Sequence, residues 1–353
     1  MYEKSSAVGM CIKSDNAAKL PINKMRNAVF SDKWGGVDAL KILSCIGVLA
    51  YHVLDDFCLA PGHDPSRVAY FLASFCVPMF FTASGFTFGR NSFSTEYVEK
   101  KIGGILKKLL GWIIFWCVVY VFIYGLKTNP FIDFIDGSFG GGVLPVSWFI
   151  FTLCLCWLFG YPVFILHEKH RPFFYVLTVV LLEVMVLKRS GFVAWNIPFY
   201  DRGTQAAWFG LYFTFFITGM LLRDISQLIV RNNAAYKILL ALALAVMSYI
   251  YAGISAFSGL WPHQFYGHWA YMIWFILLFV CAMNLCPYSK FMHVASMGTL
   301  AVYLWHLPVL LYAVRFIHVT SGAIGTFMII SLFVSGEIFY LLFRNYPLFR
   351  KML

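Results

Sequence analysis

The stretch Val37-Asp-Ala-Leu-Lys-Ile-Leu-Ser-Cys-Ile-Gly-Val-Leu-Ala-Tyr-His-Val-Leu-Asp-Asp-Phe-Cys-Leu59 decides the fold class of this chain. An apolar helix of about 20 residues crosses the hydrocarbon core of a bilayer, and this stretch is long enough to do so. Ionisable side chains lie within it, among them Asp38, Lys41, His52 and Asp55. The stretch therefore predicts a membrane-spanning helix that carries charged and titratable groups.

The composition of the whole chain also indicates a membrane protein. Of its 353 residues, 61% are hydrophobic and 12% are charged, whereas an ordinary soluble domain carries about 25% charged residues. A soluble fold of this length could not bury so much apolar surface, so the excess is expected to face lipid. Residues 1–33 are polar and basic and lack an apolar segment. They predict a flexible cytoplasmic tail and no cleavable signal peptide.

Apolar runs of spanning length recur along the chain. They fall at about 37–59, 67–89, 104–126, 147–166, 172–188, 205–222, 236–256, 268–287, 293–316 and 320–343, with ends uncertain by a few residues. Backbone groups in lipid must bond internally, which favours helices. We predict an all-α integral membrane protein, with a single bundle of about ten transmembrane helices over residues 34–353. The nine cysteines form no C-x-x-C pair, so we predict no metal site.

The distribution of Lys and Arg predicts the orientation in the membrane. With the N-terminus in the cytoplasm, 20 of the 27 Lys and Arg residues fall in cytoplasmic segments and 6 in the opposite loops, while Lys41 lies inside the first helix. This asymmetry predicts that both termini are cytoplasmic and that the protein lies in the cell membrane. Cytoplasmic loops thus account for the net charge of +11, and we exclude nucleic-acid binding.

The ionisable groups of the first helix are expected to share one face. Lys41 and His52 are eleven residues apart, which is within about 20° of three full helical turns and about 16 Å along the axis. Asp38 and Asp55 extend the stripe in both directions. Such groups cost several kcal/mol within a span unless they face a cavity or a partner, which favours a functional, inward-facing stripe. Alternatively, Lys41 snorkels to one surface and His52 lies near the other.

This helix resembles the first helix of the acyltransferase type 3 membrane family, which opens with an Asp-x-Leu-Arg-like element followed, eleven residues after the Arg, by a histidine. Lys41 occupies the position of that Arg. A lysine keeps the positive charge but lacks the planar guanidinium that can bind an anion through two hydrogen bonds. Five further segments resemble motifs of the family and follow in the family's order: Val77-Pro-Met-Phe-Phe-Thr-Ala-Ser-Gly-Phe86, Val146-Ser-Trp-Phe-Ile150, Phe213-Thr-Phe-Phe-Ile-Thr-Gly-Met-Leu-Leu222, Gly298-Thr-Leu-Ala-Val-Tyr-Leu-Trp-His-Leu-Pro308 and Tyr346-Pro-Leu-Phe-Arg-Lys351. In the fourth of these segments, Ala301 occupies a position where the family usually has serine.

The resemblance covers about residues 34–351 and is closest to compact members that acetylate cell-envelope glycans. It implies a membrane-bound O-acyltransferase that moves an acyl group, typically acetyl, from cytoplasmic acyl-CoA to a hydroxyl of a cell-envelope glycan or lipid-linked sugar. No tightly bound cofactor is expected. His52 is the candidate general base, because an imidazole accepts a proton near neutral pH. Asp55, or the neighbouring Asp56, is the candidate to orient His52. Lys41 suits the phosphates of coenzyme A.

Further residues are candidate substrate contacts: Asp38, Ser84, Trp148, Tyr303, His306 and Glu337. Several have a structural alternative. Ser84 precedes Gly85, and small residues also serve close helix packing. Tyr303 and His306 share a face one turn apart and can form a hydrogen-bonded pair. Glu337 can pair with Lys41 or with a backbone group.

A transporter or flippase is the main rival interpretation. Charged residues within the membrane and basic residues at the cytoplasmic end would also suit a protein that moves an acyl group or a lipid-linked saccharide without making or breaking a covalent bond. Such a protein would be expected to contain two related halves, which the sequence does not display. The sequence predicts neither the acceptor nor the oligomeric state.

Overall fold

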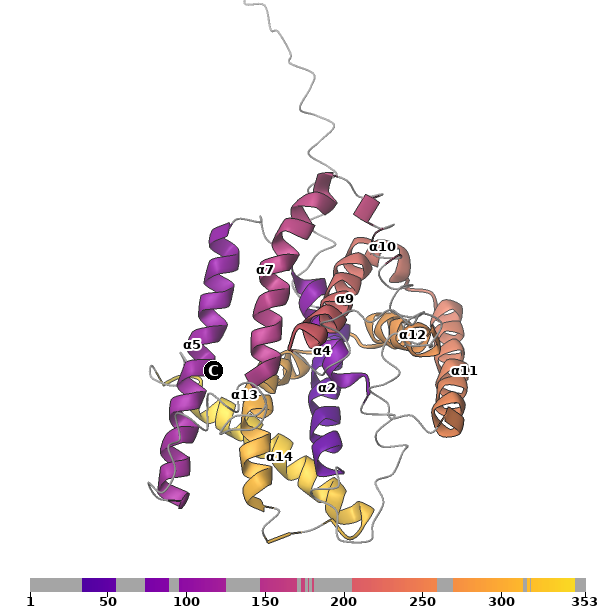
Figure 1. The fold of residues 1–353 in the computed structure, drawn as a ribbon. Coiled ribbons are helices and arrows are strands. Elements are labelled where there is room, and N and C mark those ends of the chain that lie inside the picture. Colours follow the sequence, from indigo (N-terminus) through magenta and orange to yellow (C-terminus); the bar gives the residue numbers. More distant parts are fainter. Residues whose placement is uncertain are drawn as a thin grey trace, which may run out of the picture. The chain divides into compact units, whose positions relative to one another are not determined.

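The first predicted span is a helix, and so are the others that the structure describes. The computed structural model describes residues 34–54, 74–88, 95–124, 147–169, 173–174, 177, 180, 205–258, 269–313, 316–317 and 319–346. Their helices are α2 Gly35–Val53, α4 Cys76–Thr87, α5 Thr95–Tyr124, α7 Ser147–Lys169, α9 Gln205–Asp224, α10 Ser226–Ile229, α11 Ala234–Ser258, α12 Trp269–Leu285, α13 Lys290–Ala313 and α14 Gly322–Phe343 (Figure 1).

The predicted all-α membrane class is confirmed. Nine of the ten predicted spans coincide with helices in the described ranges, and the short α10 was not predicted. The span at 172–188 lies almost wholly outside the described residues, as does the tail at 1–33. Among the residues that the structure describes, five helices are long and apolar enough to cross a membrane, namely α2, α5, α7, α11 and α14, while α4 and α12 are shorter apolar helices. The number of helices that actually cross the membrane therefore stays a prediction.

Helix α5 begins nine residues before its predicted start at 104. The added turns contain Glu96, Lys100 and Lys101, which are good helix formers although they are not apolar. A pattern of apolar residues detects only the part of a helix that is expected to meet lipid, so it misses charged helical turns at either end.

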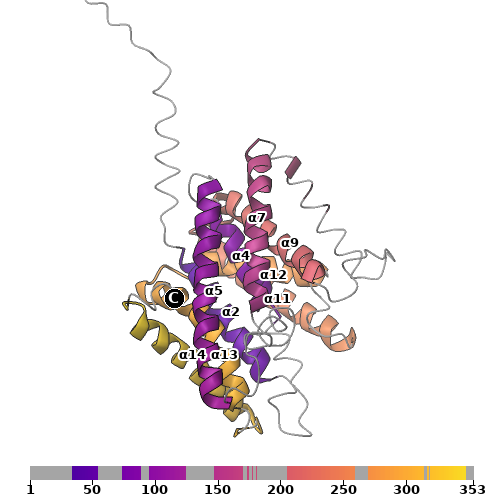
Figure 2. The same cartoon turned by 60° about the vertical axis from the view of Figure 1, so that its left-hand side comes forward.

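Helix α2 is central and α11 is peripheral. More than half of the apolar segment of α2 is buried, against 11% of that of α11. Helix α2 contacts α4, α12, α13 and α14, and it lies among helices in both views (Figure 1, Figure 2). The outer face of α11 instead presents large apolar side chains such as Leu239, Leu242 and Tyr249, which suits contact with lipid. Asp38, Lys41 and His52 therefore lie on a helix that other helices surround.

Helices α2 and α13 run side by side in the same direction. Asp38 contacts Ser296, Cys45 donates to the carbonyl of Thr299, and His52 faces His306. The three α2 residues are seven apart, the spacing that keeps one helix face against a neighbour. Two parallel helices begin on the same side of a membrane, as the first and ninth of ten alternating spans must. Which side is cytoplasmic stays a prediction.

The Ser84-Gly85 motif lies where α4 crosses α9. A Cβ added at Gly85 would collide with the carbonyl oxygen of Phe216, and one added at Gly219 would collide with that of Thr82. The Thr82 hydroxyl, whose oxygen is also 3.1 Å from the carbonyl of Pro78, bonds across the crossing to the carbonyl of Phe215 at 3.1 Å. The glycine in this motif therefore serves close packing of the two helices. The interactions that the structure gives for Ser84 stay within α4, through its own carbonyl oxygen.

Candidate functional site

Two imidazoles meet at the C-terminal end of α2. His52 is half-buried in the last turn of that helix, and its ring lies 5.3 Å from the ring of His306 on α13, centroid to centroid, with the ring planes tilted by 35°. His306 is fully buried, and its Nδ1 lies 2.6 Å from the carbonyl oxygen of Tyr303. The structure thus brings together the candidate base and one of the candidate substrate contacts.

Aromatic side chains from three helices surround Tyr303 beside this pair. The Tyr303 ring lies 5.6 Å from the His306 ring, 5.0 Å from that of Phe149 on α7 and 6.2 Å from that of Phe80 on α4. Trp148 adjoins the same group, with its ring 6.3 Å from Phe149. Trp148, Tyr303, His306 and His52 therefore belong to one cluster, with Tyr303 as its link. Asp55, the predicted orienting carboxylate, lies outside the described residues.

Three cations from three helices come together near the other end of α2. Lys41 interacts electrostatically with Asp38 and with Lys101 of α5, and Lys101 interacts with Arg223 of α9. Arg223 also donates a hydrogen bond of 2.5 Å to the carbonyl of Phe88, at the end of α4. We refer to Lys41, Lys101 and Arg223 as the cation cluster. Like charges repel, so this arrangement favours an anion that neutralises them.

Aromatic rings hold Lys101 in place. Its ammonium lies 5.2 Å from the centre of the Trp157 ring, 5.3 Å from that of Tyr97 and 5.9 Å from that of Phe88. A cation within about 6 Å of an aromatic face is attracted by the ring's quadrupole. The Lys101 side chain is therefore directed between α4, α5 and α7, and the charge it brings is fixed in position.

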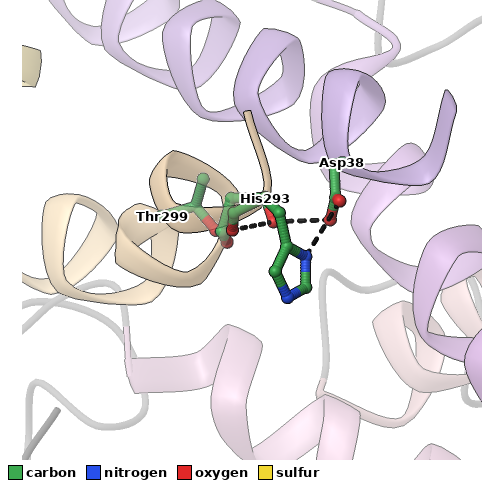
Figure 3. A network of polar contacts seen from close by, with 4 residues as sticks. Asp38, His293 and Thr299 are labelled. Atoms are coloured by element: carbon green, nitrogen blue, oxygen red, sulfur yellow. Dashed lines mark hydrogen bonds and ion pairs between the residues drawn. The ribbon is translucent and has the colours of Figure 1, made fainter. Parts of the chain in front are cut away.

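Asp38 forms hydrogen bonds with side chains of α13 (Figure 3). The Ser296 hydroxyl lies 2.5 Å from its Oδ1, and His293 Nδ1 lies 3.0 Å from its Oδ2. Thr299 extends the network by donating its hydroxyl to the carbonyl of Ser296 at 2.8 Å. Asp38 is buried, so these bonds replace its hydration. This arrangement ties α2 to α13, and the predicted contact of Asp38 with substrate stays a prediction.

Replacing Asp38 by alanine is expected to destabilise the protein. Removal of the carboxylate takes away the charged acceptor that Ser296 and His293 share, at a cost of about 1–3 kcal/mol, and leaves the Ser296 hydroxyl with the carbonyl oxygen of His293, 2.9 Å away, as its acceptor. Asp38→Asn is the matched control, because its amide oxygen still accepts from Ser296, and it should lose less. Thermal unfolding in detergent measures both. If the alanine variant unfolds at the wild-type temperature, the network does not hold α2 against α13.

Glu337 of α14 packs against the backbone of α13. A Cβ added at Gly298 would lie 2.6 Å from Glu337 Oε1, so the carboxyl group fills the space that the glycine leaves. Oε1 is buried and has no hydrogen-bond partner within the described ranges. Glu337 also interacts electrostatically with Cys45, which lies between Lys41 and His52 on α2. The carboxyl group is therefore located between the two ends of the site, beside a backbone group.

Gly298→Ala is expected to destabilise the protein by forcing Glu337 aside. Overpacking a close contact typically costs about 1–3 kcal/mol. Adding Glu337→Ala should restore part of the loss, because the shorter side chain frees the space. A double-mutant cycle of thermal unfolding in detergent measures this coupling. Additive effects of the two substitutions would contradict the contact.

The sequence analysis missed several residues of this region. His293 and Ser296 are polar residues three positions apart, a spacing that places them on one face of α13. Nothing in the sequence pairs them with Asp38, which lies more than 250 residues away. From the sequence, Arg223 was counted only as one of the basic residues in the predicted cytoplasmic segments. Lys101 was only one of several basic residues after the second span, and two of its three aromatic neighbours, Phe88 and Trp157, lie outside α5.

These features define a helical membrane protein with an imidazole pair and a cation cluster along one central helix. The family model Acyl_transf_3, described as "Acyltransferase domain", matches residues 34–342, which is nearly the whole chain. The chain therefore belongs to this acyltransferase family and is an enzyme of the O-acyltransferase type. No match was found among the curated proteins or the solved structures compared with it. The resemblance read from the motifs is confirmed, and the enzymatic interpretation is favoured over the transporter.

Proposed function

We propose that this protein transfers an acyl group, most simply acetyl, from acyl-CoA to a hydroxyl of a cell-envelope glycan or lipid-linked sugar. The observation that carries this proposal is the placement of the cation cluster and the imidazole pair on the same helix. Lys41 and His52 are eleven residues apart on α2, which corresponds to about 16 Å. This separation suits an extended pantetheine arm, with the phosphates at one end and the thioester at the other.

The cation cluster is the proposed site for the phosphates of the donor. Lys101 interacts electrostatically with both Lys41 and Arg223, and Asp38, the anion that acts on Lys41, is already bonded to α13. Three positively charged side chains contributed by three helices attract a polyanionic ligand. Acyl-CoA is then a substrate, and no tightly bound cofactor is required.

His52 is the proposed general base. The hydroxyl oxygen of the acceptor attacks the thioester carbonyl, and the hydroxyl proton passes to His52 as the new C–O bond forms. The C–S bond then breaks, and the leaving thiolate of coenzyme A takes the proton back from His52. The imidazolium formed in between lies in the last turn of α2, where the helix dipole favours positive charge.

The two substrates are proposed to enter from opposite ends. The predicted topology places the start of α2 at the cytoplasmic surface of the cell membrane, where acyl-CoA is present. His52, in the last turn of α2, would then lie towards the outer leaflet, where a glycan or a lipid-linked sugar can present its hydroxyl. Tyr303 and Trp148 are the proposed contacts to the transferred group or the acceptor, because the Tyr303 ring adjoins His306 and Trp148 is connected to Tyr303 through Phe149.

The proposal is tested with purified protein in nanodiscs supplied with acetyl-CoA and fractionated envelope glycans. Release of the coenzyme A thiol should depend on both the protein and an acceptor fraction, and label from the acetyl group should appear on that fraction. His52→Gln is the matched control and should release little thiol. Movement of a labelled saccharide across vesicles without loss of thioester would instead establish the flippase alternative and overturn the proposal.

A further inference from the structure

His306 has one nitrogen whose proton is fixed by the backbone. Nδ1 lies 2.6 Å from the carbonyl oxygen of Tyr303. A carbonyl oxygen only accepts hydrogen bonds, so Nδ1 carries the hydrogen that forms this bond. Neutral imidazole has one N–H, which leaves Nε2 as an acceptor. A second proton on Nε2 would place a positive charge in a fully buried ring, which carries a large desolvation cost.

The accepting nitrogen of His306 has an unused hydrogen-bonding capacity. Nε2 is buried and bonds to no group in the described part of the chain, which is costly for a polar atom away from water. Among the described residues, His52 is a titratable group that acts electrostatically on His306, and its ring lies 5.3 Å away. At this separation two imidazole rings can turn to face each other nitrogen to nitrogen at hydrogen-bond distance.

We propose that His306 is a positioning residue for His52. Nε2 of His306 accepts the N–H of His52, so the other nitrogen of His52 carries the lone pair and faces the acceptor hydroxyl. This deepens the proposed function and rests on it. The role is the one that a carboxylate plays in hydrolytic triads, filled here by a neutral imidazole that the carbonyl of Tyr303 holds in the required tautomer.

The proton balance of the reaction leaves His306 unchanged. As the C–O bond forms, His52 takes the proton of the acceptor hydroxyl on the nitrogen that faces the acceptor, and its other nitrogen keeps its N–H hydrogen-bonded to His306. When the C–S bond breaks, that proton moves from His52 to the departing thiolate. The burial pattern fits this division, since His52 is half-buried and His306, behind it, is fully buried. Only His52 is reached by substrate.

The two nitrogens of His306 can be tested separately with a matched pair of variants. The amide of Asn is close to the position of Nδ1, so His306→Asn keeps the donor to Tyr303 and removes the acceptor for His52. The amide of Gln reaches the position of Nε2, so His306→Gln supplies an oxygen that accepts from His52. The assay is acetyl transfer to an active glycan fraction in nanodiscs, with kcat and the KM for acetyl-CoA measured separately.

We expect His306→Asn to lower kcat by about 10- to 100-fold, the usual effect of losing a group that orients a reacting residue, with the KM for acetyl-CoA unchanged. His306→Gln should keep clearly more of kcat. Any result in which Asn retains as much kcat as Gln overturns the proposal, because the bond to Tyr303 would then be the function of His306. A wild-type protein without transfer to any fraction would instead reject the proposed function.

A spectroscopic measurement decides the case if His306→Asn does not fold. In full-length protein labelled with ¹⁵N-histidine, the two ring nitrogens of His52 report its tautomer, and His52→Gln assigns the signals. A single neutral tautomer of His52 is expected in the wild type, and His306→Gln should leave it in place. A mixture of tautomers in the wild type would overturn the proposal.

Discussion

His52→Ala is expected to lower acyl transfer by about 10²–10⁴-fold, the usual contribution of a general base. The variant should insert and fold normally, because His52 is only half-buried at the end of α2. It should also bind acyl-CoA with wild-type affinity, since the cation cluster lies about 16 Å away along the helix. Steady-state transfer and an equilibrium titration of the donor measure the two quantities separately.

The control for this prediction is His52→Gln, which keeps a polar group of similar size. If proton transfer is the role of His52, the Gln variant should fail as completely as the Ala variant. A Gln variant that transfers at nearly the wild-type rate would show that His52 is a structural hydrogen-bonding group. The base would then be sought first at His306.

Lys41→Met is expected to raise the KM for acyl-CoA by about 10- to 100-fold, the equivalent of losing one hydrogen bond to a charged group. Its kcat should change much less, because Lys41 acts on the phosphates and not on the reacting atoms. Lys41→Arg should keep much of the affinity, because it keeps the charge. Steady-state kinetics with acetyl-CoA as the varied substrate measure these effects.

Lys100→Met is the matched control for the Lys41 prediction. Lys100 precedes Lys101 on α5 but is exposed, so its removal takes the same charge from the chain and leaves the cation cluster intact. It should bind the donor almost as the wild type does. If Lys41→Met leaves affinity and turnover equally unchanged, Lys41 only extends to the membrane surface and the cluster does not bind the donor.

The sequence predicted the helices well because hydropathy is a property of each segment alone. A run of apolar residues such as 236–256 must meet lipid or bury itself, and in both cases its backbone bonds within a helix. The early start of α5 was missed because its turns carry charged residues, and α10 was missed because a helix of four residues is too short to show an apolar pattern. Positions near a helix end depend on capping and on local propensity, which a pattern of apolar residues does not measure.

The candidate site was predicted in part. The stripe on the first helix identified Asp38, Lys41 and His52, and the structure places all three on a central helix. Their partners could not be predicted, because they depend on which helix lies opposite. His293 pairs with Asp38 across 255 residues, and Glu337 packs on Gly298 and not on a charged group that the structure identifies. Periodicity in the sequence indicates which residues share one face of a helix, but it does not identify the helix that packs against that face.

The division of the site into a phosphate end and a reacting end is tested most directly by shortening the donor. S-Acetylpantetheine carries the same thioester as acetyl-CoA and lacks its phosphates. With an active glycan fraction, kcat/KM for the two donors is compared in the wild type, Lys41→Met and His52→Gln. The wild type should strongly prefer acetyl-CoA, Lys41→Met should lose most of that preference, and His52→Gln should be slow with both donors. A wild type that uses both donors equally well, or a Lys41→Met variant that keeps the full preference, would contradict the account.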